Sequence, residues 1–218
     1  MVRLCGRALA ALTLLALIAA CGSAPAPSTT ESASAGDSGE GVPASPGGVI
    51  DMVRGPLAAG VTYVFPDFNG LAVTLPEDGW SASLPNGGDA QIAGTAASVY
   101  FLLPVTIVSS DGTARRDWPS DPEQAKAQIE AVRGITIESS EPITFAGVDA
   151  ELLHVTASGL SPDAPMFQTG SGEIGLNEGS NDVILLPIGD RLLFLSVESP
   201  TDQEEDAQVV IDGLSFSE

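Results

Sequence analysis

Short apolar runs bounded by turn-forming residues recur along the chain from residue 49 onward. Runs rich in β-branched and aromatic residues, flanked by Gly, Pro, Asn or Asp, are typical of β-strands. Pro104 separates two of these runs, which predicts either two strands or one kinked edge strand. Residues 146–147 and 189–190 predict tight turns between successive strands. The predicted strands are 62–65, 70–75, 98–103, 105–108, 135–137, 143–145, 148–156, 183–188 and 192–197.

Residues 121–134 show helical spacing instead. Asp121 and Pro122 suit the N-cap and the first helical position, and Gln124 stands at the capping-box position. We expect Gly134 to end this helix as a C-terminal cap. Apolar residues recur at spacings of four and three, which places them on one face of the helix. This face holds Ala125, Ile129 and Val132.

A second helix is predicted to begin at Pro200 and Thr201, where Thr201 and Glu204 match the Thr-x-x-Glu capping box. Strands, one helix, more strands and a terminal helix together predict an α+β fold. In this fold the helices pack on a largely antiparallel sheet. The core face of the second helix is expected to hold Val210, Ile211 and Leu214.

The N-terminal residues follow a different pattern. Arg3 and Arg7 precede the run 8–20, in which one Thr is the only polar side chain. This run is too short to cross a hydrocarbon core, which takes roughly 20 helical residues. It matches the apolar region of a signal peptide behind a positively charged N-terminus.

The end of that run carries a more specific signal. Residues 17–21 read Leu-Ile-Ala-Ala-Cys, which resembles the bacterial lipobox. The resemblance implies cleavage between Ala20 and Cys21 and a diacylglyceryl thioether on Cys21. The alternative is an ordinary secretory signal with a chance cysteine. Because Cys5 would leave with the signal peptide, the lipoprotein interpretation predicts a mature chain with neither a free thiol nor a disulfide.

Residues 22–48 are rich in Ser, Ala, Pro and Gly, and Val42 is the one residue there that is larger and more apolar than Ala or Pro. Such a segment cannot bury enough apolar surface to offset its chain entropy. We therefore predict a lipoprotein signal peptide over 1–20, a lipidated Cys21 with a flexible tether over 21–48, and a single α+β domain over 49–218.

Composition narrows the classes of partner and site. The chain has 8 Lys+Arg against 29 Asp+Glu, a formal net charge of −21. Binding nucleic acid requires clustered Lys and Arg that neutralise phosphates, so no nucleic-acid partner is expected. Two cysteines cannot build a disulfide framework or a Cys-based zinc site. A single histidine excludes every mechanism that needs a His pair.

Four segments, taken in their order along the chain, form a further pattern. Residues 56–65 precede the first hairpin, and 71–80 form a strand ending in Pro-x-x-Gly-Trp. Residues 134–148 read as a glycine, strand, proline, strand and glycine, and 189–216 as a closing hairpin, helix and Leu-x-Phe strand. In this order they resemble a group of actinobacterial lipoproteins with the PsbP/LpqN-like fold. The resemblance implies a curved antiparallel sheet sandwiched by helices, an α/β/α sandwich, and no particular activity, because fold does not dictate function.

Two residue patterns could carry chemistry. Residues 170–175 match G-x-G-x-x-G, which binds a dinucleotide when it follows a strand and opens a helix. The flanking residues predict neither element, so we expect a flexible loop. His154 lies in a predicted strand without a nucleophile motif such as G-x-S-x-G, so we interpret it as a histidine at the sheet surface rather than a general base.

An acidic cluster at the start of the second helix lacks the spaced carboxylates and central glycine of a calcium loop. Compensation of the helix dipole explains this cluster without a metal. It consists of Asp202, Glu204, Glu205 and Asp206.

Aromatic residues of the domain could line an apolar pocket. Trp80 follows a turn and is expected to be a core anchor, whereas Trp118 is the better candidate for a surface contact. Beside Trp118, Arg115 and Arg116 are expected to lie in a solvated loop. The four candidates for the pocket are Trp80, Trp118, Tyr63 and Tyr100.

These patterns favour a lipoprotein anchored through Cys21 on the extracytoplasmic face of the cell membrane. We predict a domain that is a non-catalytic binding or assembly module, not an enzyme, whose partner is an envelope protein or a small ligand. No catalytic, cofactor-binding or metal-binding residue is predicted. The alternative is an envelope hydrolase or a lipid or glycan carrier. A hydrolase would need two carboxylates about 5–10 Å apart in a cleft. A concave apolar surface beside residues 159–180 would favour a small ligand, and a flat apolar patch would favour a protein partner.

Overall fold

The computed structural model of the protein describes residues 46–85, 88–108, 114–159, 165–198 and 204–217. The expected signal peptide, Cys21 and nearly all of the tether lie outside the described residues, as do Thr201 and the side chains of the acidic cluster at 202–206. In the described ranges the chain is mostly β-structure with two short helices. Neither helix has the length and apolar character needed to cross a bilayer.

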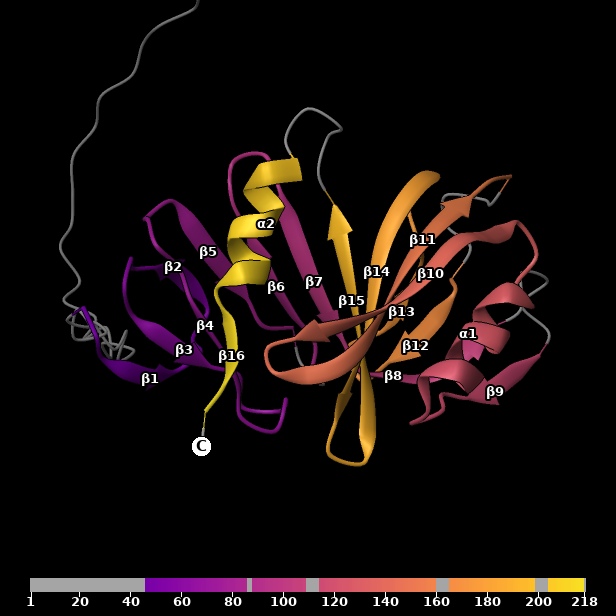
Figure 1. Ribbon diagram of the computed structural model, residues 1–218, viewed down its shortest axis with the longest axis horizontal. Helices are drawn as coiled ribbons and strands as arrows, with labels where there is room; N and C mark the ends of the chain where they lie inside the picture. The colour runs from indigo at the N-terminus through magenta and orange to yellow at the C-terminus, as the bar shows by residue number, and fades with distance from the viewer. Residues whose placement is uncertain (1–45, 86–87, 109–113, 160–164, 199–203, 218) are drawn as a thin grey trace, which may run out of the picture. The chain divides into compact units, whose positions relative to one another are not determined.

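A large sheet of eight strands forms the centre of the fold (Figure 1). Each neighbouring pair in it is antiparallel, so the prediction of a largely antiparallel sheet is confirmed. Its strands, in spatial order, are β10 (Ile135–Phe145), β11 (Val148–Ala157), β14 (Gly179–Ile188), β15 (Arg191–Glu198), β7 (Ser98–Leu102), β6 (Ala90–Ala93), β5 (Trp80–Ser83) and β2 (Gly55–Leu57).

Two sheets of four strands complete the β-structure. Their pairs are also antiparallel, except that β1 runs parallel to β3. The first sheet has the order β1 (Val49–Asp51), β3 (Thr62–Val64), β4 (Leu71–Thr74) and β16 (Leu214–Phe216). The second has the order β13 (Glu173–Ile174), β12 (Phe167–Thr169), β8 (Pro104–Val108) and β9 (Arg115–Asp117).

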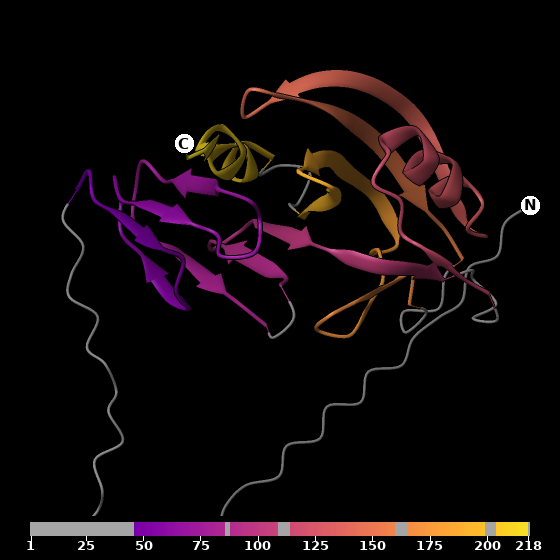
Figure 2. The same cartoon turned by 90° about the horizontal axis from the view of Figure 1, so that it is seen from below.

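The large sheet buries apolar side chains on both faces. Phe101 and Leu195 belong to a core shared with the β1-β3-β4-β16 sheet and with helix α2 (Glu204–Asp212). Phe194 belongs to a second core shared with β8, β12 and helix α1 (Pro122–Glu130). Successive residues of a strand point to opposite faces, so the consecutive apolar residues of β15 serve both cores. Figures 1 and 2 show α2 beside the N-terminal strands and α1 beside the β10–β11 hairpin.

Each outer layer is therefore a small sheet with one helix. The expectation of an α+β fold with a sheet flanked by helices is therefore correct only in part, because strands make up most of both outer layers. Some strands in these layers, such as β8, carry the β-branched residues expected of a strand, but others do not; β9, for example, is Arg-Arg-Asp and wholly exposed. Such strands form because neighbouring strands offer them backbone partners, which a periodicity of side chains does not reveal.

Two prolines affect the strands in different ways: Pro104 begins a strand, and Pro142 lies within one. Strand β7 ends at Leu102, and β8 begins at Pro104 in another sheet, so the prediction of two strands is confirmed and the kinked strand is wrong. The separate strands predicted at 135–137 and 143–145 are wrong, because β10 is continuous, with a bulge between Ile137 and Ser139. Its Pro142 is tolerated because β10 lies at the edge of the large sheet.

Helix α1 begins as predicted. The Asp121 carboxylate accepts a hydrogen bond from the Gln124 backbone N–H at 2.9 Å, and Pro122 occupies the first turn. The predicted end is wrong, since the helix stops at Glu130 and Gly134, with a φ of +86°, shapes the turn into β10 instead. The expected apolar face is confirmed, because Ala125, Ile129 and Val132 are all buried.

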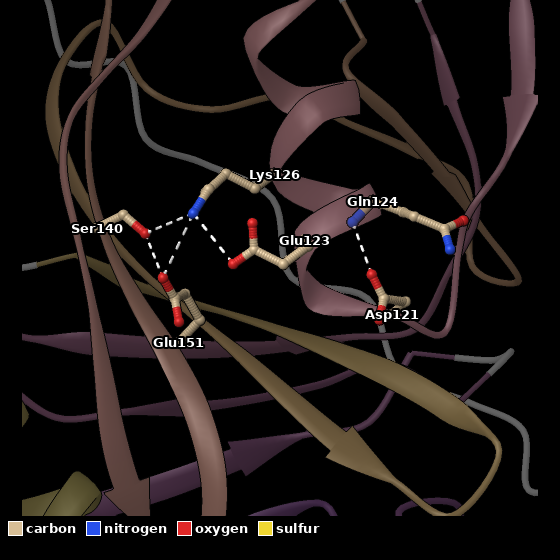
Figure 3. A network of polar contacts seen from close by, with 6 residues as sticks. All are labelled: Asp121, Glu123, Gln124, Lys126, Ser140 and Glu151. Atoms are coloured by element: carbon tan, nitrogen blue, oxygen red, sulfur yellow. Dashed lines mark hydrogen bonds and ion pairs between the residues drawn. The ribbon is translucent and has the colours of Figure 1, made fainter.

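Lys126 connects α1 to the β10–β11 hairpin (Figure 3). Its ammonium group donates to Glu123 at 3.2 Å and to the Ser140 hydroxyl at 3.1 Å, and lies 3.6 Å from Glu151. The Ser140 hydroxyl also donates to Glu151. The hydrogen bond to Glu123 is the main cause that raises the pKa of Lys126. Because Glu123 is largely solvated, this network orients the helix more than it stabilises the fold.

Candidate functional site

A cleft of about 650 Å³ opens where three strand junctions of the fold meet. One wall is the β7–β8 junction, 103–105, and another is the segment 118–120 between β9 and α1. The β14–β15 turn, 190–192, forms the third. We call this the Trp118 cleft. Its remaining lining residues are Asp67, Gly88 and Gly170.

Trp118 forms a rigid aromatic wall of this cleft. Its indole Nε1–H donates to the Leu192 carbonyl at 3.0 Å. The ring also stands edge-on to Phe167, at 5.3 Å and 86°, and to Phe194, at 6.2 Å and 73°. These three contacts fix the ring in a half-buried position. Trp118 is thus both a surface residue, as predicted, and a neighbour of the second core.

Charged groups of both signs line the same cleft. The Arg191 guanidinium donates to the Asp67 carbonyl oxygen, which ties the β14–β15 turn to residues 66–69. The side chains of Asp67 and Asp190 are exposed beside it. A ligand in the cleft would therefore meet one cation, two carboxylates and an aromatic ring, a combination suited to a polar ligand with an apolar face.

A buried carboxylate joins two segments that contribute residues to the cleft, although it does not line the cleft itself. Asp89 is 3% exposed, and its Oδ1 accepts from the Leu103 backbone N–H at 3.1 Å. Its Oδ2 accepts from the Thr169 hydroxyl at 2.6 Å and from the Ser171 hydroxyl. Asp89 thereby links the end of β7 to the β12–β13 hairpin. Sequence analysis missed this residue, because an aspartate beside two glycines resembles any turn aspartate.

The G-x-G-x-x-G segment at 170–175 contains the turn of this hairpin. The Thr169 backbone N–H donates to the Gly172 carbonyl at 2.8 Å, and the motif runs from β12 into β13. The expectation that no strand precedes the motif is therefore wrong, and so is the flexible loop. No helix follows it before β14, so the arrangement required to cradle a pyrophosphate is not formed. Gly170 instead lines the Trp118 cleft.

Arg115 holds the outer side of the same hairpin. Its guanidinium donates to Gln168 and to Glu173, the latter at 2.6 Å. Arg115 therefore belongs to a strand, β9, and to an ion pair across the sheet, so the prediction of a solvated loop is wrong for it. Arg116 is exposed, as expected.

His154 lies on the sheet surface as predicted. It is in register with Asp182 of β14, and its Nδ1 lies 2.6 Å from Asp182 Oδ1. Both side chains are partly exposed, at 41% and 47%. In the part of the chain that the structure describes, no three His, Cys, Asp or Glu side chains are grouped so that they could hold a metal ion.

The four aromatic candidates do not share a pocket, so that interpretation is wrong. Trp80 and Tyr63 are buried in the first core, and the prediction of Trp80 as a core anchor is confirmed. Tyr100 packs against the second core away from them, on the face of β7 opposite to Phe101.

Comparison with known proteins gives a structural similarity without a sequence match. No protein-family profile matches the chain, and no curated protein sequence matches it. The structure is similar to the solution structure of cyanobacterial PsbP (CyanoP) from Synechocystis sp. PCC 6803, with a TM-score of 0.41 and 10% sequence identity. The similarity covers 76% of this chain and 95% of that one. The expected likeness to PsbP is found, whereas the actinobacterial lipoprotein group stays a prediction.

Proposed function

We propose that this protein is a lipid-anchored envelope protein whose folded domain binds a small ligand in the Trp118 cleft without transforming it. The observation that carries the proposal is the cleft itself, which combines a fixed aromatic ring with a guanidinium and two carboxylates. Its volume of about 650 Å³ lies within the range of small-molecule sites. Gly170, from the segment where a concave apolar surface is expected to favour a small ligand, lines this cleft, although charged groups line it as well.

The bonding of the cleft supports a role in recognition. The Trp118 N–H and the Arg191 guanidinium donate to backbone carbonyls of the cleft walls, which fixes the shape of the site before a ligand arrives. Preorganised walls of this kind give affinity and selectivity. One observation favours the alternative of a hydrolase, because Asp67 and Asp190 line the same cleft and hydrolysis of a glycoside uses two carboxylates.

The cleft is tested by ligand-induced stabilisation. Mono- and disaccharides serve as probes, because they are polar ligands with an apolar ring face; they are added to the Trp80→Phe variant, in which Trp118 is the one tryptophan left. A sugar that binds is expected to raise the midpoint of thermal unfolding and to shift Trp118 fluorescence, because it contacts the ring. A second substitution in this variant, Arg191→Ala, should weaken the binding of such a sugar at least tenfold.

Controls separate binding from catalysis. Arg133→Ala removes the same charge away from the cleft and should leave binding unchanged. If every sugar leaves both the midpoint and the fluorescence unaltered, a saccharide-binding cleft is wrong. If a bound disaccharide is cleaved, and Asp67→Asn with Asp190→Asn abolishes cleavage but not binding, the hydrolase is right.

The anchor is tested at Cys21. Cys21→Ser is expected to abolish incorporation of labelled palmitate and to move the protein from the membrane fraction to the soluble fraction. The acidic chain, with its net charge of −21, is repelled by anionic headgroups and needs acyl chains to stay at a membrane. Cys5→Ser is the matched control, because that cysteine precedes the proposed cleavage site; it should label and sediment like the wild type. Equal labelling of Cys21→Ser and wild type would refute the anchor.

A further inference from the structure

A second cleft, of about 440 Å³, opens at the opposite end of β7 and β15 from the Trp118 cleft. Figure 1 shows the end of β15 at the top of the sheet and the β14–β15 turn at the bottom. The cleft is lined by the β6–β7 turn, 94–98, by polar residues leading into β14, and by the last residues of β15. We call it the Glu198 cleft.

Polar side chains on one face of the sheet converge at this end. Glu198 is in register with Ser98 of β7, and Tyr100 lies two residues further along the same strand, hence on the same face. The Glu198 carboxylate accepts from the Asn177 side-chain amide at 2.6 Å, and Tyr100 faces it from β7. A neutral amide from a separate segment therefore positions the carboxylate.

Glu198 is a partly desolvated anion, and no ion pair joins it to a cation among the described residues. Burial raises the pKa of Glu198, although its hydrogen bonds with Tyr100 and Asn177 act in the opposite direction. Burial and the charge of Glu198 together raise the pKa of Tyr100. Among the described residues that line the cleft, Glu198 is the one charged side chain. A cation that enters the cleft would supply the charge compensation that water no longer gives in full.

We propose that the Glu198 cleft binds the primary ammonium group of a small organic cation, with Glu198 as its charge partner. The small residues of the β6–β7 turn, Gly94 to Ala97, leave space for the organic part. Asn177 and Tyr100 orient the carboxylate towards the ammonium group. A divalent metal ion would require several oxygen ligands and usually more than one carboxylate, whereas one carboxylate suits a monovalent ammonium ion. The acidic chain also raises the local concentration of cations.

A titration followed by amide chemical shifts tests this site. The probe is n-butylammonium chloride, and n-butanol is its uncharged analogue. Butylammonium is expected to shift the amides around Ser98, Asn177 and Glu198 in a saturable way, and butanol is expected to shift none of them. Glu198→Gln should weaken butylammonium binding at least tenfold, because it replaces the anion by a neutral amide of the same shape.

Glu178→Gln is the matched control. Glu178 is exposed, adjoins Asn177 and does not line the cleft. Its substitution by Gln removes one negative charge, the same change in net charge as Glu198→Gln, but outside the cleft. It should leave the affinity within twofold of wild type. If both variants weaken butylammonium binding equally, the binding reflects general attraction to an acidic protein and the proposed site is wrong. The proposed site is also wrong if Glu198→Gln does not weaken binding. Unchanged unfolding midpoints of both variants establish that they fold.

The pH dependence gives an independent measurement. Binding needs the carboxylate, so affinity should fall as the pH is lowered through the raised pKa of Glu198, above the ordinary value of 4.5. Tyr100 is the titratable group that faces Glu198 from β7, and its raised pKa keeps it a neutral phenol throughout this range. Affinity that stays constant between about pH 7 and about pH 4 would contradict the assignment of Glu198 as the partner.

Discussion

Asp89→Ala is expected to lower the free energy of unfolding by about 3 kcal/mol, because it removes one buried acceptor from three donors. The Leu103 backbone N–H loses its carboxylate partner in a position that water does not easily reach. The Thr169 and Ser171 hydroxyls lose their bonds to Oδ2, although Thr169 also lies 3.2 Å from the Gly172 carbonyl. Urea denaturation measures this loss.

Asp89→Asn distinguishes the acceptor from the space it fills. The amide keeps one oxygen acceptor and nearly the same volume, so we expect a loss between that of Asp89→Ala and wild type. Thr169→Val removes a donor to the same carboxylate, and its effect should not add fully to that of Asp89→Ala, since the two residues share a hydrogen bond. A loss below about 1 kcal/mol in Asp89→Ala would contradict the view that this carboxylate holds Leu103 and the β12–β13 hairpin together.

The stability of the fold and the shape of the Trp118 cleft are linked through this carboxylate. Leu103 and Gly170 line the cleft, and Asp89 bonds to Leu103 and to Thr169, the residue before Gly170. A variant at Asp89 should therefore weaken ligand binding even though Asp89 itself does not line the cleft.

Local chemistry made part of this fold predictable. Asp121 and Pro122 define the start of α1 by themselves, because an N-cap carboxylate and a first-turn proline act on adjacent backbone. The turn between β10 and β11 was predictable for the same reason. Ala146 and Gly147 have φ values of +49° and +80°, and a tight hairpin turn requires this left-handed pair. The end of α1 was not predictable in this way, since the length of the helix depends on where β10 docks.

The strands that sequence analysis missed depend on distant partners. Strand β5 is Trp-Ser-Ala-Ser and β6 is Ala-Gln-Ile-Ala, and neither has the β-branched density of a strand. They form because β6 pairs with both β5 and β7. The strand β12, close to the G-x-G-x-x-G segment, is held in the same way by β8, which precedes it by more than fifty residues.

The candidate sites were still less predictable, because their parts are remote in sequence. Asp89 and Thr169 are separated by 80 positions, and Trp118 and Leu192 by 74. Neither pair forms a motif. The sequence nevertheless identified Trp118 as a surface candidate, because a tryptophan beside Arg115 and Arg116 is unusual for a core residue.

Phe194→Ala is expected to destabilise the fold by about 3–5 kcal/mol, the range for deleting a phenyl ring from a packed core. Phe194 is fully buried, and its ring lies 4.6 Å from that of Phe167 and 6.2 Å from that of Trp118. The cavity left behind would also remove one of the contacts that fix the Trp118 ring. In a Trp80→Phe background, we therefore expect Trp118 to become more accessible to acrylamide quenching and ligand affinity to fall.

Phe101→Ala is the matched control for this effect on the cleft. Phe101 is equally buried but belongs to the first core, where its ring lies 4.8 Å from that of Phe65. Its removal should cost a similar free energy of unfolding and leave the quenching of Trp118 unchanged. If both variants alter Trp118 quenching to the same extent, the ring is sensitive to stability in general. If only Phe194→Ala does so, the second core sets the aromatic wall of the cleft.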